Sequence, residues 1–192
     1  DIIALGTNLV RHIWKEILNV DLENDFPLIS YDKAMNDYGS DKPDIRFDMK
    51  LIDFNSHIIN SEFETFINII KKDGIVKAIV CPNAEKYSRK IIDELTSWIK
   101  TYYGAKGLAW FKVKDKQFEG GIARFFDESL QSKILSDNNI PEGSIIFMVG
   151  DSKKIVLNAM GALRLKLAER ENLIENDKWA PLWVVDFPLF EK

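Results

Sequence analysis

The stretch SIIFMVGDSKKIVLNAMGALRLKL, residues 144–167, decides the fold of this chain. Its first part, Ser144 to Val149, is dominated by large apolar residues and indicates a strand that is buried on both faces. Asp151 or Ser152 then begins a long helix, since both residue types cap helix N-termini. The apolar positions of this helix recur at helical spacing, at Ile155, Val156, Ala159, Leu163 and Leu167. The pattern predicts a domain in which strands and helices share one core.

Strand and helix patterns also alternate on the N-terminal side of this stretch. β-branched and apolar runs bounded by turn residues indicate strands, and three- to four-residue apolar spacing behind a capping residue indicates helices. The expected elements are strands over 66–70 and 75–80 joined by an Asp73-Gly74 hairpin, a helix from Ser88 to Gly104, a strand over 108–114 and a helix from Asp127 to Leu135.

The two ends of the chain have a different pattern. An amphipathic helix with one apolar stripe is expected to end near Asn19, and a short helix over 31–38 is expected between a Ser30 cap and Gly39. The final apolar strand, 182–186, has no neighbouring strand in sequence, so it must pair elsewhere. The stripe of the first helix consists of Leu5, Leu9, Ile13 and Ile17.

The composition is that of a chain that folds. Of the 192 residues 46% are hydrophobic and 29% are charged, which excludes a disordered tail or a collagen-like repeat. A single cysteine, Cys81, excludes an intramolecular disulfide, and there is no signal core or membrane-length apolar run. We therefore expect a cytoplasmic protein without a membrane partner. The net charge is −4, but residues 71–116 hold eleven Lys or Arg against five Asp or Glu, a basic island of +6 in a remainder of −10.

A catalytic site is not evident from the residues alone. His12, His57 and Cys81 lie far apart in sequence and lack metal-ligand spacing, so we interpret them as structural residues. The acidic positions of the loop 40–53 have the oxygen ligands that a hard cation needs, but Lys42 and Arg46 lie among them and favour internal ion pairs. These positions are Asp41, Asp44, Asp48 and Asp53.

Three segments have features of anion or nucleic-acid binding. Gly150–Lys154 lies at a strand-to-helix junction without phosphate-loop spacing, and we interpret Asp151 there as a helix cap followed by solvated lysines. Gly104–Gly107 is interpreted as a helix stop and a turn. The strand face of Trp110, Lys112 and Lys114 has an aromatic platform and two cations, as single-stranded nucleic-acid sites do, but a packed tryptophan with extended lysines is the favoured interpretation.

Five strings of residues, spread from the first helix to the last strand, are informative together. One is Tyr38-Gly-Ser-Asp-Lys-Pro-Asp-Ile-Arg46, and the other four are Leu9–Trp14, Tyr103–Trp110, Ala159–Lys166 and Lys178–Pro188. In these strings and their order the chain resembles bacterial-type aspartyl-tRNA synthetases, which are class II enzymes; the first string differs from the family string by Ile45 in place of Leu.

This resemblance implies an α+β fold in three parts. Residues 1–53 would be the part of the catalytic domain that follows motif 2, residues 54–173 a two-layer GAD insertion domain with a mostly antiparallel sheet, and residues 174–192 the return strand of the catalytic domain. The chain would be an internal fragment, since it lacks an initiator methionine.

The resemblance also implies a reaction. The parent enzyme would activate aspartate with ATP and Mg²⁺, transfer it to tRNA in protein biosynthesis, and act as a homodimer. Its motif 1, 2 and 3 residues fall outside this sequence, so we assign no catalytic, cofactor-binding or metal-binding residue, and we expect the chain alone to be inactive. The insertion would be structural or a weak tRNA contact; the alternative is a non-catalytic GAD-type module, as in a tRNA-dependent amidotransferase.

Overall fold

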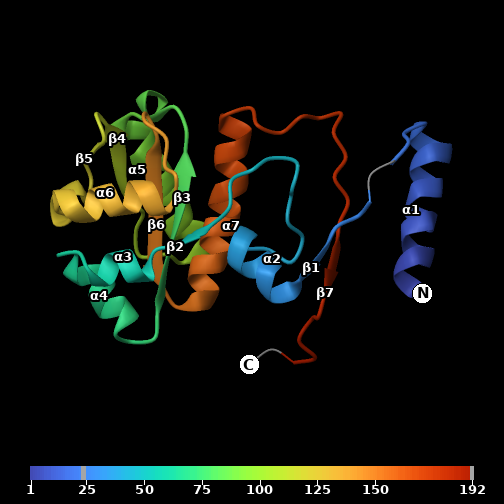
Figure 1. Ribbon diagram of the computed structural model, residues 1–192, viewed down its shortest axis with the longest axis horizontal. Helices are drawn as coiled ribbons and strands as arrows, with labels where there is room; N and C mark the ends of the chain where they lie inside the picture. The colour runs from blue at the N-terminus through green and yellow to red at the C-terminus, as the bar shows by residue number, and fades with distance from the viewer. Residues whose placement is uncertain (23–24, 191–192) are drawn as a thin grey trace.

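The structure is a computed structural model that describes residues 1–22 and 25–190 (Figure 1). Its N-terminal elements are α1 (Ile2–Leu18), β1 (Leu28–Ser30) and α2 (Tyr31–Tyr38). The central elements are β2 (Ile52–Asp53), α3 (Asn55–Ile59), α4 (Glu64–Ile70), β3 (Ile75–Cys81), α5 (Arg89–Tyr103), β4 (Ala109–Lys114), β5 (Gln117–Glu119), α6 (Glu128–Asp137), β6 (Ile145–Asp151) and α7 (Lys153–Arg170), with 3₁₀ turns η1 (Ala84–Lys86) and η2 (Ala123–Phe125). Strand β7 (Trp183–Val185) follows, and the last two residues of the expected segment 174–192 lie outside the described residues.

A five-stranded antiparallel sheet in the order β2-β3-β6-β4-β5 forms the centre of the molecule. Strand β6 pairs with β3 along its whole length, from Ile145 opposite Cys81 to Asp151 opposite Ile75, and with β4 on its other side. Every residue of β6 is buried, because strands cover both of its edges and helices cover both of its faces. This position explains the unbroken apolar run that the sequence displays there.

Helices lie on both faces of the sheet (Figure 1). Phe147 and Val149 face the cluster formed with α5 and α7, whereas Ile146 and Met148 face the cluster formed with α3, α4 and α6. The expected α+β class with an antiparallel sheet is confirmed. Because helices cover both faces of the sheet, the domain has three layers, where two layers were expected.

The flanking segments form a second, smaller unit beside α7. Strands β1 and β7 pair in parallel, with Leu28 opposite Trp183 and Ser30 opposite Val185, so the final strand has its partner within the chain. Helix α1 lies at the far end of the molecule and has no buried residue. It contacts β7 where the Trp183 indole Nε1 donates to Thr7 Oγ1 at 2.9 Å.

Helix α7 joins the two units, because it packs on the sheet with one side and on α2 with another. The contact with α2 is backbone to backbone: a Cβ at Gly161 would clash with the carbonyl oxygen of Gly39. Gly39 itself is the left-handed C-cap of α2, with φ 67°. Glycine is therefore required on both sides of the joint, for close approach at Gly161 and for approach and backbone conformation at Gly39.

Most predicted helix ends are confirmed. The side chains of Ser30, Ser88 and Asp127 accept hydrogen bonds from the third residue beyond them, and Gly104, like Gly39, ends its helix in the left-handed conformation.

The predicted hairpin at Asp73-Gly74 is wrong. Residues 66–70 belong to helix α4, because Phe63, Phe66, Ile67 and Ile70 follow a helical spacing in which Phe66 and Ile67 are buried together. Asp73, at φ 60°, takes the left-handed position of the turn that follows. The interpretation of Asp151 as a cap is also wrong: Asp151 ends β6, and Ser152 is the N-cap residue of α7.

A Gly161→Ala substitution tests the joint between α2 and α7. We expect it to lower the free energy of unfolding by about 1–3 kcal/mol, because the new methyl group must push the helices apart. Gly107→Ala is the matched control, since a Cβ at Gly107 meets nothing within 4 Å. Equal urea midpoints for the two variants would contradict the backbone contact.

Candidate functional site

The largest fully buried side chain of the described residues is the arginine Arg164 on α7, which is 1% exposed. Its Nε donates to the carbonyl oxygen of Met49 at 2.6 Å, and its Nη2 donates to that of Phe47 at 3.1 Å. The guanidinium also lies 4.0 Å from the ring centroid of Phe47 and 4.9 Å from that of Tyr38. Burial lowers the pKa of this guanidinium, and nearby Tyr38 and Asp44 offset part of that effect. Carbonyl dipoles and aromatic faces thus replace water around the cation.

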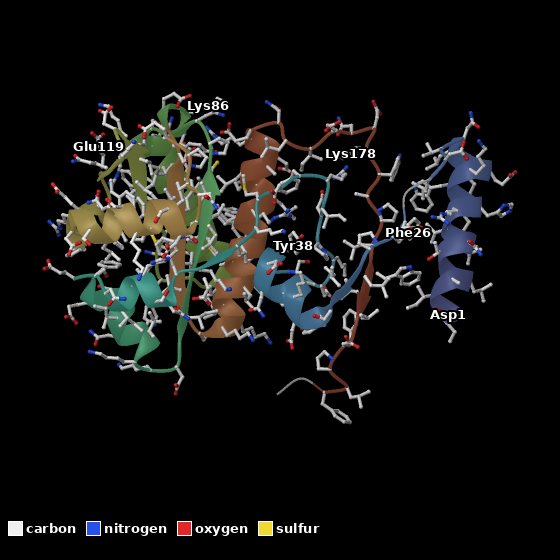
Figure 2. All side chains as sticks on the ribbon, viewed as in Figure 1. Asp1, Phe26, Tyr38, Lys86, Glu119 and Lys178 are labelled. Carbon is white, nitrogen blue, oxygen red and sulfur yellow. The ribbon has the colours of Figure 1, made fainter. Side chains whose placement is uncertain are left out.

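These contacts fix both ends of the loop 40–46, which carries the family string. Phe47, Met49 and Leu51 alternate into the core on the α7 side of the sheet. Within the loop, Arg46 donates to both carboxylate oxygens of Asp44, with Nη2 to Oδ2 at 2.7 Å. This bond holds the pKa of Asp44 below its usual value. The loop is therefore held internally by the ion pair within it and externally by Arg164. It follows Tyr38, which is labelled in Figure 2.

A groove runs beside this loop, where segments distant in sequence meet. Two adjoining hollows of ≈350 Å³ and ≈340 Å³ share Leu22 and the segment 178–181. Asp44 and Arg46 border one hollow and Ile45 borders the other. Three of the strings that carry the family resemblance, 9–14, 38–46 and 178–188, therefore meet at one groove. On its wall Trp14 and Trp179 meet edge to face, with ring centroids 5.5 Å apart.

A second polar cluster joins the end of α7 to the segment after β3. The carboxylate of Glu171 accepts hydrogen bonds from Asn83 Nδ2 at 2.7 Å, Lys86 Nζ at 2.9 Å and Tyr87 OH at 2.9 Å. Burial alone would raise the pKa of Glu171, but these three donors outweigh it and the pKa is lowered. Cys81 Sγ lies 3.1 Å from Tyr87 OH. Every member of the cluster has a partner, so it acts as a structural clamp.

The candidate residues found in the sequence are not brought together. His12 is exposed on α1. His57 lies on α3 and is buried, with its Nε2 3.2 Å from Nδ2 of Asn138, the C-cap residue of α6. Burial raises the pKa of the Cys81 thiol to about 11, which is the opposite of a nucleophilic cysteine. Among the described residues, no three His, Cys, Asp or Glu side chains gather as a metal site.

One ion pair forms inside the acidic loop, between Asp44 and Arg46, as interpreted from the sequence. Asp53 has a partner from outside the loop, the buried Lys77 of β3, at 3.6 Å.

On the strand face of Trp110, Lys112 and Lys114, the tryptophan is packed against the protein, which was the interpretation favoured from the sequence. Trp110 is partly buried against the α7-side core, and Gly120 lies over its ring. Lys112 is opposite Glu119 in the β4–β5 pair, and Lys114 Nζ lies 3.9 Å from Glu119 Oε1. Partial burial and a nearby carboxylate reduce what this face offers to a nucleic acid.

The analysis of the residues alone missed Arg164 and Glu171. Both lie in or just after the helix of the opening stretch, and charged residues at the end of an amphipathic helix are usually solvated. A signal was present at Arg164: Met160, Leu163, Leu167 and Ala168 surround it at helical spacing, which leaves no polar face for it.

An antiparallel sheet domain placed between two segments that pair with each other is the arrangement of an insertion domain. Its central part, residues 66–160, matches the GAD domain family.

The relatives of the whole chain are aminoacyl-tRNA ligases. The chain is 43% identical over 192 residues to the aspartate–tRNA ligases of Halalkalibacterium halodurans and Macrococcus caseolyticus. It is 41% identical over 191 residues to the aspartate–tRNA(Asp/Asn) ligase of Brachyspira hyodysenteriae. Each alignment covers 100% of this chain and 32% of the relative, so the chain spans about a third of the length of the curated relatives it matches. The expected resemblance to bacterial aspartate–tRNA ligases with a GAD domain is confirmed.

Arg164→Leu tests the guanidinium clamp. We expect a loss of about 2–5 kcal/mol in the free energy of unfolding, because two buried carbonyl groups lose their donor. Arg164→Lys keeps the positive charge but not the planar guanidinium, so its loss of free energy of unfolding should be smaller than that of the leucine variant. A urea series that ranks the leucine variant at or above the lysine variant would rule out this role.

The buried His57 predicts a pH dependence of stability. Burial lowers its pKa from the ordinary 6.5, so the unfolded chain binds this proton more readily than the native protein. His57 therefore contributes stability that is fully present above pH 6.5 and is lost as the pH falls through its lower native pKa. Urea unfolding between pH 7.5 and 5 should show a weaker decline for His57→Gln than for wild type, while His12→Gln, at an exposed position, should follow wild type.

Proposed function

We propose that this chain is the GAD-bearing part of an aspartate–tRNA ligase, a cytoplasmic enzyme that joins aspartate to tRNA with ATP and Mg²⁺. The identity of 41–43% along the whole chain to ligases of that name supports the proposal most directly. Three of the family strings meet at one groove beside the loop that Arg164 holds, and this arrangement agrees with the proposal.

The proposed role of the sheet domain is structural: it supports the flanking segments. The supporting observation is the joint, in which α7 belongs to the sheet core and also contacts the flanks through Gly161 and Arg164. A domain attached by one flexible linker would have no such double attachment.

The flanking segments have the surfaces of an incomplete unit. Helix α1 exposes an apolar stripe, with Leu5 72% and Ile17 75% exposed, and Phe187 after β7 is 51% exposed. Among the described residues the parallel sheet β1–β7 has two strands, whereas parallel strands are normally buried in larger sheets. We propose that these surfaces pack against the rest of a ligase catalytic domain, within a homodimer.

We propose that the activation of aspartate and its transfer to tRNA rely on catalytic residues outside this chain. The described residues contain no group of three His, Cys, Asp or Glu that could hold Mg²⁺, and we propose that the metal and ATP are bound by residues outside this chain. No helix among the described residues is long and apolar enough to cross a membrane.

An ATP–pyrophosphate exchange assay tests whether the catalytic residues lie outside this chain. The 192-residue chain should catalyse no aspartate-dependent ATP–pyrophosphate exchange, whereas a full-length protein containing it should catalyse the exchange and charge tRNA. Exchange by the chain alone would refute the assignment of no catalytic residue, and a full-length protein inactive with aspartate would refute the ligase proposal.

The structural role competes with a tRNA contact through the Trp110 face. Lys112→Glu with Lys114→Glu in the full-length protein separates the two. We expect an unchanged KM for tRNA, because Trp110 is packed and Lys114 lies near Glu119. A several-fold rise in KM for tRNA would favour the contact instead.

A further inference from the structure

Helix α2 connects the central sheet domain to the β1–β7 pair. Figure 1 shows it between α7 on one side and the two flanking strands on the other. At its start, Ser30 is both the last residue of β1 and the N-cap of α2. The ring of Tyr31 lies 5.1 Å from that of Phe187, which follows β7. The start of α2 is therefore tied to both flanking strands.

The other end of α2 is fixed by α7. A Cβ on Gly39, the C-cap of α2, would lie 2.7 Å from the Cα of Gly161, so the two backbones are in direct contact. The guanidinium of Arg164, about one turn further along α7, lies 4.9 Å from the ring centroid of Tyr38. The end of α2 is thus held by a glycine and an arginine that both belong to the sheet domain.

The same guanidinium also holds the chain that leaves α2. The two hydrogen bonds of Arg164 go to the carbonyl oxygens of Phe47 and Met49. Two residues further on, Leu51 N donates to the carbonyl oxygen of Asp37, in the last turn of α2, at 2.7 Å. The guanidinium, the segment 47–51 and the end of α2 are therefore joined to one another.

The direction of α2 depends on these end contacts, because its length offers few others. Ala34 is the buried residue of this helix, and the ion pair of Lys33 with Asp37 lies within it. A helix of eight residues is about 12 Å long, so a tilt of about 10° at its C-terminal end moves its start by about 2 Å. Strand β1 ends at that start, so β1 and its partner β7 move with it.

We infer that Arg164 is a positioning residue for the ligase reaction: from within the sheet domain it sets the direction of α2 and thereby the position of the β1–β7 pair. The inference rests on the proposed function, in which this pair packs against the rest of the catalytic domain. Arg164 contacts no substrate in this role. A misplacement of about 1 Å can cost an enzyme about a hundredfold in rate, so a shift of the pair reaches the catalytic residues as a loss of rate.

The rate per active molecule of the full-length protein tests this role. The burst of pyrophosphate released as enzyme-bound aspartyl-adenylate forms counts the folded, active molecules. A loss of stability alone lowers this count and leaves the kcat of each molecule unchanged. We expect Arg164→Leu to lower the kcat of ATP–pyrophosphate exchange about tenfold or more per counted molecule, and Arg164→Lys, which keeps the charge, to lower it less. An unchanged kcat per counted molecule would overturn the inference.

Ile134→Ala is the matched control for a loss of stability. Ile134 is 0% exposed on α6, in the core cluster on the face of the sheet opposite α7, and this cluster includes neither α2 nor the segment 47–51. Its truncation leaves a cavity in the same domain. The kcat per counted molecule should stay at the wild-type value. A drop equal to that of Arg164→Leu would contradict the role of Arg164, because any loosening of the domain would then suffice.

Distances in the 192-residue chain give a readout that is independent of activity. Spin labels on Lys90→Cys in α5 and Asp32→Cys at the start of α2 report where α2 lies on the sheet domain; both positions are exposed, whereas Cys81 is buried. Arg164→Leu should shift or broaden the distance by about 2 Å or more, as the tilt of α2 requires. Arg164→Lys should change it by less, and it replaces the leucine variant if that variant does not fold. Equal distances in wild type and the Arg164 variants would show that Arg164 does not position α2.

The two readouts separate this inference from the ligase proposal. A full-length protein that is inactive with aspartate rejects the ligase proposal, while the distances still decide whether Arg164 positions α2. An active full-length protein in which neither the rate per molecule nor the distance depends on Arg164 rejects the inference and leaves the ligase proposal intact.

Discussion

One buried cation, the guanidinium of Arg164, links the central domain to the segments around it. It lies on the helix of the sheet core, yet its two hydrogen bonds go to Phe47 and Met49, more than a hundred residues earlier. A charge this deeply buried is costly unless its donors are satisfied. The loop cannot leave without exposing two carbonyl groups and uncovering the cation, so loop, helix and sheet form one unit.

Helix α7 belongs to both units. A helix that packs against a single neighbour keeps a polar face toward solvent. Helix α7 instead has buried residues almost all round, because the sheet lies on one side of it and α2 on another. Gly161 permits the second contact because a Cβ at this position would clash with the carbonyl oxygen of Gly39. The cluster around Glu171 closes the far end of α7 onto the segment after β3. The domain is thus attached to the flanking segments through Gly161 and Arg164 in the second half of α7, whereas the Glu171 cluster holds the end of this helix within the domain.

Charge is distributed unevenly over this frame. The basic island does not form one continuous surface: Lys77 is buried beside Asp53, Lys86 bonds to Glu171, and Lys114 lies near Glu119. Near the start of α7, Lys106 Nζ lies 3.6 Å from Asp151 Oδ2, whereas Lys153 and Lys154 are exposed. Net charge by segment indicated that the region is basic, but only the tertiary structure shows which of its lysines lie beside carboxylates.

Local chemistry determined what the sequence alone could predict. The caps Ser30, Ser88 and Asp127, the left-handed stops at Gly39 and Gly104, and the buried strand before α7 depend on neighbouring residues, and all were read correctly. The family resemblance was equally local, since it consists of short ordered strings.

Tertiary structure decided what local patterns leave open. Residues 66–70 are rich in β-branched residues but form a helix, because Phe66 and Ile67 reach the sheet core only from one helical face. The β4–β5 hairpin has no glycine at its turn; Asp115 and Lys116 hold positive φ there because Glu142, distant in sequence, accepts both of their N–H groups. Arg164 and the partner of β7 were equally hidden, because each depends on a contact across most of the chain, and sequence spacing does not encode which distant groups meet.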